Sequence, residues 1–168
     1  MTGPARRKSR LAQWREETRP DDAAAIYGTI VTTAVIGATG LQPSRTILEL
    51  ALGTLLVFWL AHVYAEALAH HLDGARLRWS TISHAMTKER SMLEAPAPSL
   101  LALLLGAFGL LDDRSAVLLA LWLGVGQLVG WGIAYARSQD WNWPMALLAG
   151  VVNGMFGVAI VVLEGLLH

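Results

Sequence analysis

Apolar residues gather in long runs that are separated by short polar segments. The first run covers residues 23–41 without a charged residue, which is enough helix to cross about 30 Å of hydrocarbon. Further apolar runs follow at residues 46–71, 98–111, 116–136 and 142–166. The pattern predicts an all-α, polytopic integral membrane protein with about five transmembrane helices.

Two of these runs differ from an ordinary span in length. The run at 46–71 corresponds to roughly 39 Å of helix, so its last two turns should emerge into the membrane interface. The run at 98–111 is short, and Pro96 and Pro98 fit best in or before its first turn. This segment is either a full crossing or a re-entrant half-helix, and the second case leaves four crossings.

The polar segments define the rest of the organisation. Residues 1–22 form a basic tail, and residues 23–168 form a single transmembrane domain. The longest internal polar stretch, residues 73–96, is expected to be a loop with a short helix on the membrane surface. Asp21 and Asp22 suit the positive end of a helix that begins near Ala23.

Basic residues give an independent indication of orientation, because lysine and arginine concentrate in cytoplasmic segments. With the N-terminus in the cytoplasm and five crossings, eleven of the thirteen lysines and arginines lie inside. Only Arg45 and Arg114 remain outside. The distribution predicts a protein of the inner or plasma membrane with its N-terminus cytoplasmic and its C-terminus outside.

Composition narrows the function classes. The chain is 54% hydrophobic and 15% charged, and its 13 acidic residues balance its 13 basic ones, so no basic surplus points to nucleic acid. The lipid bilayer is the expected partner. Because the chain has no cysteine, any metal ion would need histidine and carboxylate ligands.

A polar stripe interrupts the second run. At 100° per residue, Trp59, His62, Glu66, His70 and Asp73 fall within an arc of about 80° on one helix face. An ionisable side chain in this position costs roughly 2.5 kcal/mol or more if it faces lipid. The stripe should therefore face protein or water.

Two interpretations of the stripe remain open. As a functional site it is a proton relay or cation site, in which His62, Glu66 and His70 could also bind a divalent metal. As a structural feature, Glu66 accepts hydrogen bonds from both histidines and holds helices together. Tyr27 in the first run should lie at about the depth of Glu66, and its hydroxyl could join such a pathway.

Small and amide residues predict how the last two spans pack. Both spans carry a G-x-x-x-G pattern, and both carry one amide near their middle, where it needs a hydrogen-bond partner. The residues concerned are Gly126, Gly130, Gly150 and Gly154, with the amides Gln127 and Asn153. We expect close helix contact within one chain or between copies, and the two amides could bond each other.

The leading functional hypothesis is a small ion channel or transporter for protons or cations. A chain of this size has little room to enclose a pathway alone, so a homo-oligomer is expected. The alternative is a non-catalytic membrane scaffold or accessory subunit that binds a partner through the tail and the 73–96 loop. A membrane metalloenzyme is the third hypothesis, and it lacks any recognisable nucleophile or phosphate-binding loop, so catalysis is not expected.

Overall fold

A computed structural model of the chain describes residues 22–40, 42–72 and 79–167. Every regular element in these ranges is an α-helix, which confirms the all-helical class. The helices are α2 (Asp22–Ala38), α3 (Ser44–Leu72), α4 (Trp79–Lys88), α5 (Ser91–Glu94), α6 (Ala97–Ala107), α7 (Asp113–Ser138) and α8 (Trp143–Leu167).

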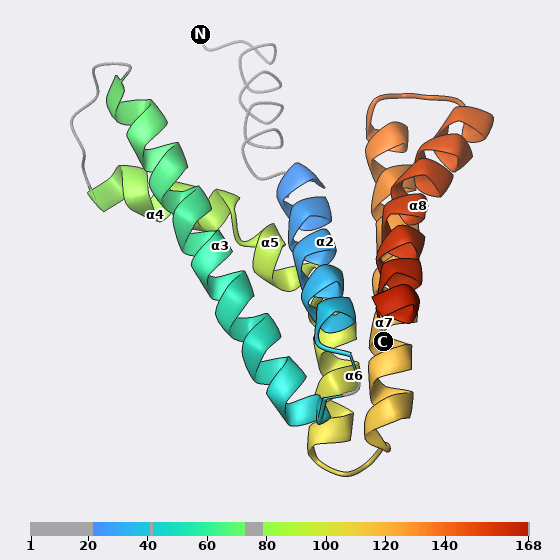
Figure 1. The fold of residues 1–168 in the computed structure, drawn as a ribbon. Coiled ribbons are helices and arrows are strands. Elements are labelled where there is room, and N and C mark those ends of the chain that lie inside the picture. The colour runs from blue at the N-terminus through green and yellow to red at the C-terminus, as the bar shows by residue number, and fades with distance from the viewer. Residues whose placement is uncertain (1–21, 41, 73–78, 168) are drawn as a thin grey trace, which may run out of the picture.

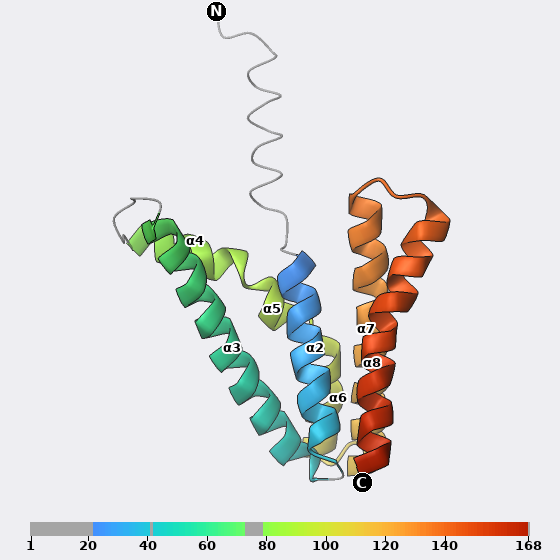
Figure 2. The same ribbon diagram turned by 45° about the horizontal axis from the view of Figure 1, so that its top comes forward.

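The long helices run roughly side by side in alternating directions (Figures 1 and 2). Helices α2, α6 and α8 point one way, and α3 and α7 point the other way. The backbone N–H of Ser44 donates a 2.8 Å hydrogen bond to Oδ1 of Asp113, so the α2–α3 turn and the α6–α7 turn lie at the same end. Gly109 in the second of these turns has a φ of 72°, which favours glycine.

Within the described part of the chain, three helices are long and apolar enough to cross a membrane: Ser44–Leu68, Asp113–Ser138 and Trp143–Leu163. The apolar helices Ala23–Ala38 and Ala97–Ala107 are shorter. Leucine, valine and phenylalanine side chains are exposed along α3, α7 and α8, as lipid contact would require. The fold is compatible with a polytopic membrane protein.

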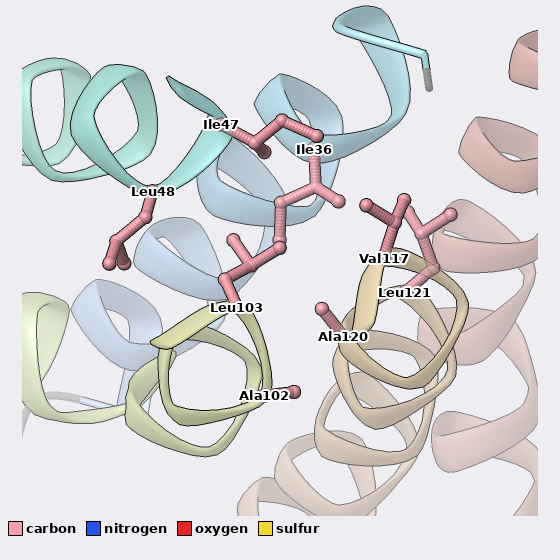
Figure 3. Packing of buried hydrophobic residues seen from close by; sticks show 8 residues of the cluster. All are labelled: Ile36, Ile47, Leu48, Ala102, Leu103, Val117, Ala120 and Leu121. Carbon is pink, nitrogen blue, oxygen red and sulfur yellow. The ribbon is translucent and has the colours of Figure 1, made fainter. Parts of the chain in front are cut away.

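The main apolar core lies where α2, α3, α6 and α7 converge, near the end that carries Ser44 (Figure 3). Large side chains from all four helices meet there, and those of Ile36, Ile47, Leu103 and Leu121 are fully buried. The cluster contains Ile36, Ile47, Leu48, Ala102, Leu103, Val117, Ala120 and Leu121. This core fixes one end of the bundle.

Towards the opposite end, α5 packs closely against α2. A Cβ atom at Gly28 would collide with the backbone of Met92, so only glycine permits this approach. Met92 is fully buried in a second cluster with Ala24 and Leu55. The sequence predicts a loop at 73–96 with a short helix on the membrane surface, whereas α5 within this segment buries Met92 against α2.

A break at residues 95 and 96 separates the short helix α5 from the apolar helix α6. Pro96 and Pro98 have no N–H to donate, so the helical ladder is interrupted between α5 and α6. Gln127 on α7 replaces a backbone hydrogen bond that is missing at this break, because its Nε2 donates to the carbonyl oxygen of Ala95. Its Oε1 accepts a 2.9 Å hydrogen bond from Ser99 Oγ. Helix α6 itself has 11 residues, or about 17 Å, and ends before residues 108–111 of the predicted span.

Glycine at the α7–α8 contact differs in part from the predicted pattern. Gly150 and Gly154 of α8 do lie against α7, where added Cβ atoms would meet Ile133 and Val129. The glycine of α7 that faces α8 is Gly132. The sequence left open whether the G-x-x-x-G glycines pack within one chain or between copies. Within the chain, Gly126 and Gly130 take no part in the contact between α7 and α8. No atom of the described residues lies within 4 Å of a Cβ at either position.

Candidate ionisable site between α2, α3 and α4

Glu66 forms an ion pair across two helices. Nζ of Lys88, the last residue of α4, donates to Oε1 of Glu66 on α3 at 2.7 Å. The Glu66 side chain is 25% exposed and that of Lys88 is 41% exposed, so the pair is only partly buried. Lys88 is one of the eleven basic residues that the sequence predicts to be cytoplasmic, and no sequence pattern indicates its contact with Glu66.

His62 lies one turn before Glu66 along α3. Its Nδ1 is 2.9 Å from the carbonyl oxygen of Phe58, and since a carbonyl can only accept, Nδ1 carries the proton. Proton exchange at this ring is therefore left to Nε2. The predicted clamp, in which Glu66 accepts from both histidines, has no support at this nitrogen, because Nδ1 is engaged by the helix backbone.

Tyr27 of α2 joins the same site from the opposite side. Its ring centroid lies 4.9 Å from that of His62 and 5.8 Å from that of Phe58, with tilted planes in both cases. Tyr27 therefore lies beside His62, one turn of α3 from Glu66, whose depth the sequence predicted for it. Tyrosine, histidine, glutamate and lysine side chains follow one another from α2 across α3 to α4.

Two predicted members of the stripe cannot be placed. The His70 side chain and Asp73 lie outside the described residues. Among the residues that are described, no group of three or more His, Asp or Glu side chains could hold a metal ion. The divalent metal site at His62, Glu66 and His70 remains a sequence prediction.

The sequence analysis missed one buried carboxylate. Glu89, between α4 and α5, is only 6% exposed. In the sequence it stands in the charged stretch "TKER", which is typical of a solvated surface, so no local signal identifies it. Its burial depends on the way α5 enters between α2 and α3, which is a tertiary effect.

The two membrane amides are both bonded, but not to each other. Gln127 joins α7 to the break between α5 and α6, as described above. Asn153 Nδ2 donates a 3.0 Å hydrogen bond to the carbonyl oxygen of Leu128, which joins α8 to α7. The predicted Gln127–Asn153 bond is therefore wrong, because each amide meets a backbone carbonyl on a different neighbour.

Comparison with known proteins adds no family to this description. The chain matches no protein-family profile, and it shows no significant similarity to a characterised protein or to a solved structure. The class of protein is thus defined by its own fold, an all-helical chain compatible with a membrane.

Proposed function

We propose that the protein is a small membrane transporter or channel for protons or cations, and that the ionisable site between α2, α3 and α4 binds the transported ion. The observation that carries this proposal is the Glu66–Lys88 pair. Lysine here acts as a tethered cation on a carboxylate that can exchange it for another cation or a proton.

The exposure of the pair supports exchange. Ion pairs that remain in contact with solvent contribute about 0–1 kcal/mol, so opening this pair costs little. Once Lys88 has moved away, Glu66 offers a carboxylate to an incoming ion. His62 lies one turn before Glu66 on the same helix, and an imidazole nitrogen can donate or accept a proton.

The proposed topology has five crossings with the N-terminus in the cytoplasm of a cell bounded by an inner or plasma membrane. The Ser44–Asp113 hydrogen bond supports it, since a chain that leaves this end through α3 must return to it before α7 begins. If α3 crosses the bilayer, the segment from α4 to α6 crosses it as well. Helix α2 has 17 residues, or roughly 26 Å, and supplies the remaining crossing.

Assembly into a homo-oligomer is part of the proposal. One copy has few helices with which to surround a pathway, and the surfaces of α3, α7 and α8 expose many large apolar side chains. Lipid or a second copy of the chain can cover such surfaces.

The test compares two variants of the pair in reconstituted vesicles, with proton or cation flux measured by an internal dye. Glu66→Gln should abolish flux while thermal stability changes by about 1 kcal/mol or less, because the lost pair is partly solvated. Lys88→Gln should retain flux and reach half-saturation at a lower ion concentration, since the competing cation is gone.

Glu49→Gln is the matched control, because Glu49 also loses a pair, with Arg45 at 3.0 Å, at an exposed position of the same helix. Its flux should equal that of the unmodified chain. Absence of flux in the unmodified protein, or equal flux in Glu66→Gln, would contradict the transport proposal.

The same ion pair also favours a second function, a membrane scaffold or accessory subunit. Because Lys88 already balances the negative charge of Glu66, the site needs no bound ion. The pair then attaches α4 to α3 and holds α4 where a partner protein can bind it. If the protein is a scaffold, Glu66→Gln and Lys88→Gln should weaken partner binding equally. The unmodified protein and both variants should then show no ion flux.

A further inference from the structure

The break between α5 and α6 adjoins a cavity that the proposed ion site does not use. The cavity has a volume of about 510 Å³, and its lining residues come from α5, the start of α6, and α7, of which α6 and α7 lie side by side in Figures 1 and 2. Its walls are mainly apolar, with Trp131 as the aromatic surface. A volume of this size accommodates a small organic ligand.

Polar groups at the cavity are few and incompletely used. Ser91 is 5% exposed, and its buried Oγ has no hydrogen-bond partner among the residues that the structure describes. Gln127 uses one N–H for Ala95 and one lone pair for Ser99, which leaves a second N–H available. An unpaired hydroxyl in a buried position is costly, and a ligand oxygen would satisfy it.

The electrostatics of the cavity favour an uncharged acceptor. Glu94 is the only ionisable residue among its described lining residues, and it forms an exposed ion pair with Arg90 at 3.4 Å. The N-terminus of α6 begins at Ala97 beside the cavity, and its partial positive charge favours an oxygen acceptor over an ammonium group. Glu94 in turn disfavours a carboxylate.

We propose that this cavity binds a neutral, lipid-soluble carbonyl compound, whose oxygen accepts hydrogen bonds from Ser91 Oγ and Gln127 Nε2 while its apolar body packs on Trp131. Pro98 and Gly130 are exposed at the cavity, so it opens on the outer surface of the helices. Gln127 lies about 17 Å from the Ser138 end of α7, within the hydrocarbon depth. The ligand therefore enters from the bilayer.

Photolabelling of the full chain with benzophenone, a neutral aromatic ketone, tests the site. Irradiation should attach the probe to residues that line the cavity. Mass spectrometry of the digested protein should find the label on the peptides that contain Trp131 and Pro98. Gly130→Leu should abolish this labelling, because its side chain would enter the cavity without a clash at the Cβ. Gly126→Leu is the matched control, since position 126 is equally open but does not line the cavity, and labelling should persist.

Competition defines the ligand class. Decan-2-one should displace benzophenone, whereas decylammonium and decanoate should not. Ser91→Ala should lower the affinity for decan-2-one about five- to tenfold, because one hydrogen bond is lost. Weaker labelling in vesicles of ester lipid than of ether lipid would identify a lipid ester as the natural ligand, and equal labelling would identify a free carbonyl compound. The proposal is overturned if Gly130→Leu labels normally, if decylammonium competes best, or if labelling spreads evenly over the lipid-facing helices.

Discussion

Glycine at position 28 is the residue that sets the distance between α2 and α5. Gly28→Ala should destabilise the protein by about 1–3 kcal/mol, because the new Cβ meets the backbone of Met92 and a backbone cannot move aside as a side chain can. Thermal unfolding in detergent measures the effect.

Gly53→Ala on α3 is the control for this substitution. No atom of the described chain lies within 4 Å of a Cβ there, so alanine should leave stability unchanged or raise it by about 0.5–1 kcal/mol through its better helix propensity. Equal destabilisation by both variants would show that α5 does not pack on α2 at Gly28.

Asp112 makes the start of α7 sensitive to acid. It is the N-cap residue, and the hydrogen bond that it accepts from the Ser115 N–H lowers its pKa below the ordinary value of 3.8. A lowered pKa in the folded state adds stability above the ordinary pKa, and this contribution disappears as the pH falls through the folded value.

Asp112→Asn keeps a capping oxygen without the titrating charge. Between about pH 5 and pH 3 the unmodified chain should therefore lose more thermal stability than the variant. Parallel stability curves for the two proteins would count against a role for the Asp112 charge.

At the scale of elements, the interrupted α5–α6 segment depends on a side chain of α7. Gln127→Leu leaves the Ala95 carbonyl and the Ser99 hydroxyl without their partner, which should cost about 1–3 kcal/mol of unfolding free energy. Asn153→Leu should cost less, because the Leu128 carbonyl that Asn153 contacts lies within α7 and retains its helical bond. Unfolding of both variants in detergent gives the comparison, and a larger loss for Asn153→Leu would refute it.

The uninterrupted helices could be predicted from the sequence, whereas the broken one could not. Helices α3, α7 and α8 lie within three residues of the predicted runs at 46–71, 116–136 and 142–166, since length and hydropathy alone determine such helices. The sequence around α5 indicates a polar segment, because charged residues precede it in the chain. Its burial depends on the gap that Gly28 leaves on α2, which no local pattern reveals.

Side-chain pairing was the least predictable part of the site. On α3, His62 contacts Tyr27 of α2, and Glu66 pairs with Lys88 of α4. Their partners come from other elements, and 22 residues separate Lys88 from Glu66, so helical periodicity carries no information about the contact. For the same reason, glycine spacing on α7 did not distinguish Gly132 from Gly130 as the residue facing α8.

For the whole molecule, the proposed topology can be tested by labelling, since the chain has no cysteine of its own. Gln42 and Gln139 are exposed in turns at opposite ends of the bundle. In intact cells a membrane-impermeant maleimide should label Gln42→Cys and leave Gln139→Cys unlabelled. Permeabilised cells provide the control, in which both should react, and labelling of Gln139→Cys alone would reverse the orientation.

The dependence of the α5–α6 break on α7 also bears on how the chain is made. Gln127 is synthesised 32 residues after Ala95, whose carbonyl it satisfies. Until α7 emerges from the ribosome, residues 91–107 offer the bilayer a short helix with an unsatisfied carbonyl, which lipid cannot accommodate. Under the proposed topology, we therefore expect this segment to wait at the membrane surface during synthesis and to insert together with α7 as a helical hairpin.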